Sequence, residues 1–135
     1  MEQPYSFLYV EDDPLSSEVM RMMLEMGLGY TDVTIFRTSD DFMSRLTALP
    51  RVPAVILLDI HVQPIDGFAM YRMIRSDEAY RCTRVIALTA SVMSEEIERL
   101  RQSGFDGVIA KPLSIQTFPE LMIRVINGES VWSIA

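Results

Sequence analysis

Carboxylates, a hydroxyl and a lysine follow four apolar runs of this chain at the point where each run ends. The four places are Glu11 and Asp12 after Phe7–Val10, Asp59 after Ala54–Leu58, Thr89 after Val85–Leu88, and Lys111 after Val108–Ala110. In an open parallel sheet the carboxyl ends of the strands meet at one edge, and ligands bind there. We therefore expect these polar side chains to converge on one site.

The acids predict a metal site. Two carboxylates about 4 Å apart repel by about 4 kcal/mol at an effective dielectric constant near 20. If Glu11, Asp12 and Asp59 converge, they must take up a proton or bind a cation. Oxygen ligands at an open edge favour Mg²⁺ or Mn²⁺. The alternatives are that Asp12 or Asp13 only caps a helix and that Glu11 is a solvated acid.

Lys111 and Thr89 extend the chemistry beyond metal binding. A transferring phosphoryl group needs its charge neutralised and needs donors for its equatorial oxygens. A metal, a lysine and a hydroxyl supply both, and the Asp59 carboxylate could then act as the nucleophile that forms an acyl phosphate. Taken singly, Lys111 could be an ordinary turn lysine and Thr89 a cap at a strand end.

The composition indicates one soluble domain. The chain has 135 residues, of which 49% are hydrophobic, enough for one packed core. A net charge of −7 argues against binding to nucleic acid. The single cysteine, Cys82, permits no internal disulfide, and neither a signal peptide nor a membrane-spanning stretch is apparent. We expect a cytoplasmic protein that does not bind membranes.

Strands and helices are expected to alternate along the chain. The apolar runs, rich in Val and Ile, predict strands at 6–10, 32–36, 54–58, 84–88 and 106–110. Helices are expected at 14–27, 39–48, 67–76, 94–102 and 117–127. Strict alternation predicts a parallel sheet with helices on both faces.

Several helix starts carry capping signals. Asp13 before Pro14 is typical of an N-cap followed by the first helical position. Ser94 is expected to cap the fourth helix, and Thr117 has capping-box spacing to Glu120.

The tail at 128–135 contains the only tryptophan, Trp132. We expect this tail to pack back on the domain, the alternative being contact with a partner.

The chain resembles the receiver domains of response regulators in two-component signalling. The matching segments are Tyr9–Pro14, Leu57–Ile60, Asp66–Gly67, Val85–Ser91 and Ala110–Pro112. The resemblance covers residues 5–127. It implies the flavodoxin-like fold, a doubly wound five-stranded parallel sheet in the order 2-1-3-4-5 with five helices on both faces. Beyond these residues and the tail, no output domain is expected.

The resemblance also implies residue roles. Asp59 matches the phosphoacceptor. Glu11 and Asp12 match the metal-binding acids, with the backbone carbonyl of His61 as a further ligand. The remaining matches are Thr89 as the switch hydroxyl, the Ala90 N–H as a phosphoryl donor, and Lys111 as the phosphoryl-binding lysine, whose bond to Pro112 is usually cis.

Three positions depart from the family pattern. The usual proline four residues after the acceptor is Gln63 here, and Pro64 follows it. Val108 stands where the family often has a rotating Tyr or Phe. Glu11 replaces the commoner Asp, so we expect it to bind a metal through water.

The leading hypothesis is a phosphoacceptor rather than an enzyme, although it assists its own phosphorylation and dephosphorylation. A histidine kinase or histidine phosphotransfer protein would dock on helix one, where methionines cluster at Met20, Met22, Met23 and Met26. The phosphoryl signal would pass to a downstream protein through helix four, strand five and helix five.

Two other classes stay open. A non-phosphorylated interaction module is compatible with Val108 and the displaced proline, but the complete set of acids, hydroxyl and lysine argues against it. A phosphatase with an aspartate nucleophile would need a second Asp at position 61. In an FMN-binding flavodoxin, the acidic residues Glu11–Asp13 would repel the phosphate of FMN.

Overall fold

The computed structural model describes residues 5–133 of the chain. The expected absence of a signal peptide rests on residues 1–4, which lie outside the described residues, as do the last two residues of the expected tail, 134–135. No helix within residues 5–133 has the length and apolar character required to cross a bilayer.

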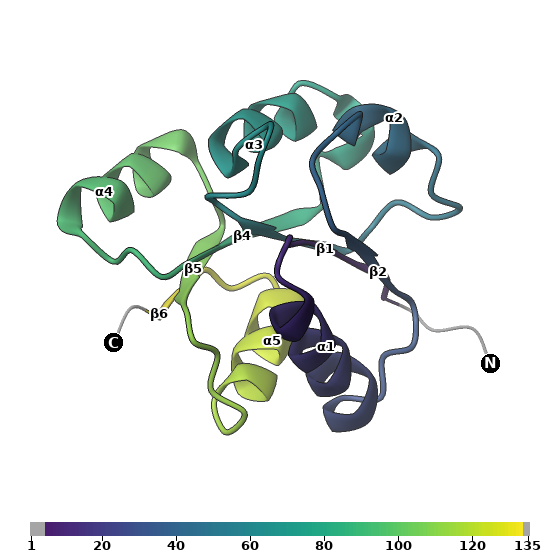
Figure 1. The fold of residues 1–135 in the computed structure, drawn as a ribbon, viewed down its shortest axis with the longest axis vertical. Coiled ribbons are helices and arrows are strands. Elements are labelled where there is room, and N and C mark those ends of the chain that lie inside the picture. Colours follow the sequence, from purple (N-terminus) through teal and green to yellow (C-terminus); the bar gives the residue numbers. More distant parts are fainter. Residues whose placement is uncertain (1–4, 134–135) are drawn as a thin grey trace.

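A parallel sheet forms the middle layer of the molecule (Figure 1). Its strands in the described part of the chain are β1 (Phe7–Val10), β2 (Val33–Phe36), β3 (Val55–Asp59), β4 (Arg84–Thr89), β5 (Gly107–Ala110) and β6 (Val131–Ser133). Their order is β2-β1-β3-β4-β5-β6. The parallel sheet and the order of its first five strands are confirmed, but the expectation of five strands is wrong because the tail adds a sixth.

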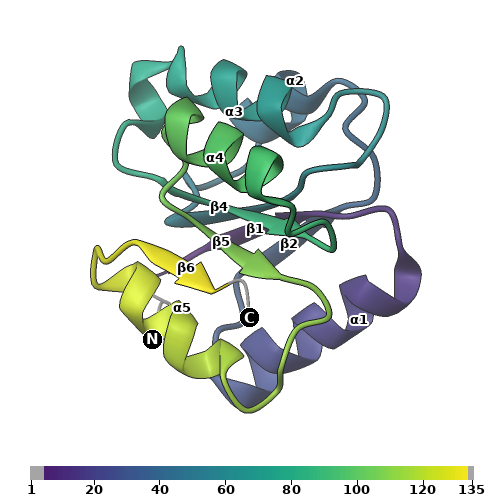
Figure 2. The same cartoon turned by 90° about the vertical axis from the view of Figure 1, so that its left-hand side faces the viewer.

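Helices cover both faces of this sheet, as expected. They are α1 (Pro14–Met22), α2 (Phe42–Thr47), α3 (Gly67–Arg75), α4 (Ser94–Ser103) and α5 (Phe118–Ile126). A π-helical turn, η1 (Met23–Gly27), continues α1, and a short 3-10 turn, η2 (Glu78–Tyr80), follows α3. Helices α1 and α5 lie on one face, and α2, α3 and α4 lie on the other (Figures 1 and 2).

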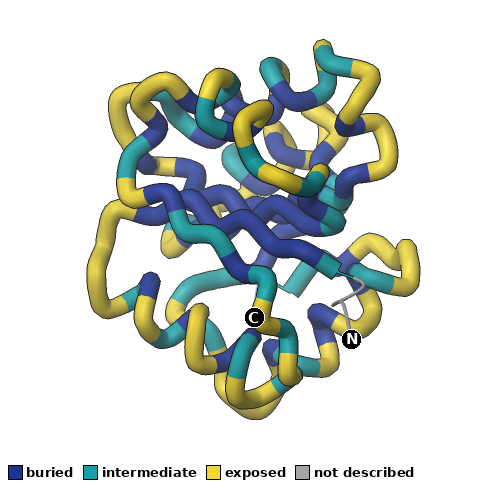
Figure 3. Tube along the Cα trace, turned by 90° about the vertical axis from the view of Figure 1, so that its right-hand side faces the viewer, coloured by how far each residue is buried: buried dark blue, intermediate teal, exposed yellow. Residues whose placement is uncertain are grey.

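The strands are buried on both faces, which explains why their sequences are continuous apolar runs rather than alternating ones (Figure 3). Leu8 and Ile56 belong to the core beneath α2, α3 and α4. Phe7 and Leu57 belong to the core beneath α1 and α5. The sheet is therefore held rigidly between two apolar layers, and only its edges and strand ends reach solvent.

The capping predictions had mixed outcomes. Asp13 caps α1 by accepting a hydrogen bond from the Ser16 N–H at 2.9 Å, and Pro14 occupies the first helical position. Ser94 is not the cap of α4, because the helix begins at Ser94 itself and Met93 takes the N-cap position. Thr117 precedes α5 but makes no side-chain capping bond.

The tail packs back on the domain as strand β6, which pairs with the outer edge of β5 (Figure 2). Gly107 permits this contact, since a Cβ there would lie 2.1 Å from the Val131 carbonyl oxygen. The register places Trp132 opposite Val108, and the Arg101 guanidinium of α4 stacks on the indole ring at 4.1 Å. The edge of β5, which the tail was not expected to pair with, is thus covered by the chain itself.

Candidate functional site

Three carboxylates converge at the carboxyl edge of the sheet, as the sequence predicts. β1 and β3 are neighbours with Val10 opposite Leu58, so the residues after β1 lie beside the last residue of β3. Glu11, Asp12 and Asp59 each offer an oxygen within 4.8 Å of the others. Glu11 and Asp59 are buried and Asp12 is exposed, so the cluster has an inner wall and one side open to solvent.

Glu11 forms the inner wall of this site. Its Oε1 accepts hydrogen bonds from Lys111 Nζ at 2.6 Å and from the Tyr9 hydroxyl at 2.7 Å, and Oε2 accepts one from the Asp13 N–H at 3.2 Å. Burial alone would raise the pKa of Glu11, but the hydrogen bonds from Lys111 and Tyr9, together with the contact with Asp59, lower it to about 2. Glu11 is therefore a fixed anion at the base of the cluster.

Asp59 is less well compensated than Glu11. Its Oδ1 accepts a hydrogen bond from the His61 N–H at 3.1 Å, and its Oδ2 lies 3.8 Å from Lys111 Nζ. Burial, together with the nearby Glu11, raises the pKa of Asp59 to about 6. The site thus holds more negative charge than Lys111 neutralises.

The donor set fits a hard divalent cation. All of its ligand atoms are carboxylate oxygens, and three acids face the single ammonium of Lys111. Asp12, which is exposed beside the two buried acids, leaves one side open for water ligands. No His or Cys completes a softer site among the described residues, which favours Mg²⁺ or Mn²⁺ over zinc.

Thr89 lies beside Asp59 at the sheet edge, but its hydroxyl makes its hydrogen bonds elsewhere. β4 pairs with β3 so that Leu88 is opposite Asp59, which puts Thr89 one residue beyond it at the same edge. The hydroxyl accepts a hydrogen bond from the Ser91 N–H at 3.0 Å and lies 3.2 Å from an oxygen of Glu96. None of its hydrogen bonds goes to Asp59 or Lys111. Ala90, the expected N–H donor, follows at an exposed position.

The loop after Asp59 is held by contacts at both of its ends. The Gly67 N–H donates to the Ile60 carbonyl at 3.0 Å, and a Cβ at Gly67 would lie 2.8 Å from the Ile60 Cα. The Ile65 N–H donates to the buried Ser39 hydroxyl at 2.7 Å. The Gln63–Pro64 bond is cis, as is Lys111–Pro112, and only the second was expected.

Comparison with known proteins agrees with this geometry. The response regulator receiver domain family matches residues 7–123, most of the chain. This chain belongs to the response regulator receiver family. It is thus a receiver domain of two-component signalling, as its motifs predicted.

The chain is also similar to individual proteins. The receiver is 32% identical over 117 residues to the polar-differentiation response regulator DivK of Brucella anthropi, covering 87% of this chain and 92% of that protein. Among solved structures, the receiver domain of a signal transduction histidine kinase from Syntrophus aciditrophicus matches with a TM-score of 0.79 at 26% identity over 92% of this chain and 91% of that one. The receiver domain of a DNA-binding response regulator from Colwellia psychrerythraea matches with a TM-score of 0.80 at 24% identity over 91% and 98%.

Two residues of the receiver's site were not predicted from the sequence. Tyr9 was assigned only to a buried strand, although a buried tyrosine hydroxyl usually needs a partner and here donates to Glu11. Glu96 was not expected at the site, whereas its Oε1 accepts from the Thr89 hydroxyl and lies 3.1 Å from His61 Nε2. Only the second lacked any sequence signal, because it depends on how α4 sits against the loop after β3.

Proposed function

We propose that Asp59 accepts a phosphoryl group from a phosphohistidine of a histidine kinase or histidine phosphotransfer protein. The observation that carries the proposal is the meeting of Glu11, Asp12 and Asp59 within 4.8 Å, with Lys111 Nζ between two of them at 2.6 and 3.8 Å. A carboxylate nucleophile, ligands for a hard cation and a phosphoryl-binding ammonium are thus present together.

Each residue of the site has its own proposed role. Mg²⁺ (or Mn²⁺) would be held by Asp12, Asp59, the backbone carbonyl of His61 and, through water, Glu11, and it would neutralise charge on the phosphoryl oxygens. Lys111 binds a further phosphoryl oxygen. The Thr89 hydroxyl and the Ala90 N–H donate to the group once it is attached.

The transfer makes one bond and breaks one. An Asp59 oxygen attacks phosphorus, the P–N bond of the phosphohistidine breaks, and its electron pair returns to the imidazole, which takes a proton from water. The product is an aspartyl phosphate on this chain. The protein is consumed as an acceptor and regenerated by hydrolysis, so we propose a signalling domain rather than an enzyme with an external substrate.

Helix α1 is the proposed docking site of the phosphodonor. The methionine cluster divides between two roles: Met20 and Met23 are buried core residues, whereas Met22 and Met26 are 57% and 81% exposed. Leu15, in the first turn of α1, borders a hollow of about 250 Å³ that Lys111 also lines. An apolar, adaptable surface thus adjoins the acceptor site, as docking of another protein requires.

The output surface is proposed on α4, β5 and α5, now extended by β6. Because β6 covers the outer edge of β5, a downstream protein would meet the exposed edge of β6 in place of β5. A net charge of −7 favours a protein partner over nucleic acid.

Titration with beryllofluoride and Mg²⁺, followed by NMR of the amides near Asp59, tests this function. We expect a saturable response that is absent in Asp59→Asn. A wild-type protein without response would support the non-phosphorylated interaction module instead.

A further inference from the structure

A carboxylate outside the acceptor cluster holds the Thr89 hydroxyl. Thr89 is fully buried, and its Oγ1 lies 3.2 Å from both the Ser91 carbonyl and Glu96 Oε1 while accepting from the Ser91 N–H. A hydroxyl has one hydrogen and donates to one acceptor at a time, and an ionised carboxylate is the stronger acceptor. Glu96 is therefore the main acceptor for this proton.

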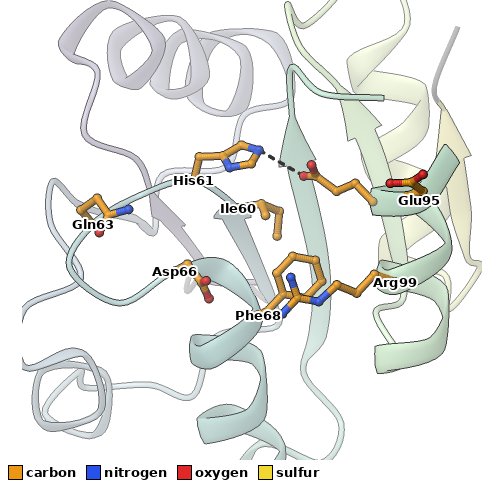
Figure 4. A pocket seen from close by; sticks show the side chains of 8 residues that line it. Ile60, His61, Gln63, Asp66, Phe68, Glu95 and Arg99 are labelled. Atoms are coloured by element: carbon orange, nitrogen blue, oxygen red, sulfur yellow. Dashed lines mark ion pairs between the residues drawn. The ribbon is translucent and has the colours of Figure 1, made fainter. Parts of the chain in front are cut away.

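Glu96 is itself fixed from a second side. His61 Nε2 lies 3.1 Å from the same Oε1, and this pair is the dashed line in Figure 4. Glu96 belongs to the first turn of α4, and His61 to the loop after β3. The Glu96 side chain is only 18% exposed, compared with 59% for His61. One oxygen atom thus connects the loop that follows the acceptor, the end of β4 and helix α4.

We infer that Glu96 is a positioning residue that holds the Thr89 hydroxyl in its unphosphorylated orientation. The inference rests on the proposed function, because it concerns the hydroxyl that would donate to the phosphoryl group. Thr89 cannot donate its single proton to Glu96 and to a group on Asp59 at once. Glu96 therefore competes with the phosphoryl group for this proton. Before phosphorylation, it sets the fraction of molecules in which the Thr89 hydroxyl points toward Asp59.

The surroundings of Glu96 allow its carboxylate to move away from Thr89. A phosphoryl group brings a charge of about −1.5 to −2 and repels a nearby carboxylate. Glu96 borders a hollow of about 330 Å³ that is also lined by Phe68 and Arg99 (Figure 4). The Arg99 guanidinium lies over the Phe68 ring at 3.8 Å, so a cation stands on the far side of that space. A carboxylate that leaves Thr89 has room and a positive partner in α4.

A comparison with Glu95 distinguishes a specific role of Glu96 from a general effect of negative charge. It is the neighbouring acid in the same first turn of α4, lines the same hollow and makes no hydrogen bond to Thr89. Both acids interact equally with the helix dipole. If Glu96 acted only through the dipole or the net charge, Glu95→Ala and Glu96→Ala would behave alike.

Two measurements test the inference. The ¹³C shift of the Thr89 γ-methyl group, which reports χ1, is recorded without metal or phosphoryl mimic for wild type, Glu96→Ala, Glu96→Gln and Glu95→Ala. Beryllofluoride affinity is then measured in Mg²⁺. We expect Glu96→Ala to shift the methyl signal and to tighten beryllofluoride binding about three- to tenfold, the value of one hydrogen bond. Glu96→Gln, which keeps an acceptor oxygen, falls between Glu96→Ala and wild type, and Glu95→Ala matches wild type.

An unchanged Thr89 signal and unchanged affinity in Glu96→Ala would overturn the inference, as would equal effects in Glu95→Ala. These failures are distinguishable from failure of the proposed function, in which wild type itself does not bind beryllofluoride.

Discussion

Lys111 Nζ lies 2.6 Å from Oε1 of Glu11, closer than its 3.8 Å approach to Asp59 Oδ2. The lysine expected to bind a phosphoryl group thus neutralises a buried acid. This contact raises the pKa of Lys111 despite the opposing effect of its burial, and it helps to keep Glu11 ionised. One ammonium therefore serves two carboxylates, and Glu11 is the better compensated of the two.

The Lys111–Glu11 pair predicts a strong coupling in stability. Lys111→Met leaves the buried Glu11 charge without its main partner, which should lower the free energy of unfolding by about 3 kcal/mol in metal-free buffer. Adding Glu11→Gln removes the orphaned charge and should recover much of this loss. Urea unfolding of both single variants and the double variant measures the coupling. Additive effects of the two substitutions would show that the pair contributes nothing.

The raised pKa of Asp59 predicts that ionisation of this carboxyl destabilises the metal-free fold. Its pKa rises from 3.8 to about 6 on folding, so the native state binds more protons in that window and stability falls as pH rises through it. Asp59→Asn removes this cost and should stabilise the protein by on the order of 1–3 kcal/mol at pH 7.5, with the gain vanishing below about pH 4. Urea unfolding across this pH range checks the prediction. A gain that does not vary with pH would contradict it.

Asp12 predicts a metal-binding role separable from folding. It is exposed, so Asp12→Asn should leave the metal-free melting temperature nearly unchanged while removing most of the stabilisation that Mg²⁺ gives to wild type. Thermal melts with and without Mg²⁺ measure this difference. Asp41→Asn is the control, because Asp41 has a left-handed backbone that Asn tolerates and makes no capping bond. An equal Mg²⁺ effect in Asp12→Asn and wild type would exclude Asp12 as a ligand.

The close approach of β6 to Gly107 predicts that a side chain at this position would detach β6 from the sheet. In Gly107→Ala the added Cβ would clash with the backbone of Val131, so β6 should separate from β5. Trp132, the only tryptophan, would lose its contact with Arg101, and its fluorescence should shift to longer wavelength. Gly27→Ala is the matched control because nothing lies within 4 Å of a Cβ there. An unchanged emission spectrum in Gly107→Ala would show that β6 tolerates the clash.

The acceptor cluster could be predicted from the sequence because parallel strands impose it. Once apolar runs are assigned to neighbouring parallel strands, the residues that follow them must meet, as Glu11, Asp12, Asp59 and Lys111 do. The identity of the residue types then indicates the chemistry, and the expected cis bond before Pro112 is also present.

The features that depend on tertiary packing could not be predicted. Strand β6 has only three residues, too few for a periodic signal, and it forms because β5 offers an unpaired edge and Gly107 a close approach. The outward orientation of Thr89 depends on Glu96, whose position is set by how α4 packs. Ser94 is not the cap of α4 because that helix begins at Ser94 itself.

Phosphorylation of Asp59 is the central claim, and intact-mass spectrometry after incubation with acetyl phosphate and Mg²⁺ tests it most directly. Wild type and Asp41→Asn should each gain the mass of one phosphoryl group, and Asp59→Asn should gain none. Chelation of Mg²⁺ should abolish the adduct in wild type. No adduct on the wild-type protein, or an undiminished adduct on Asp59→Asn, would contradict the account.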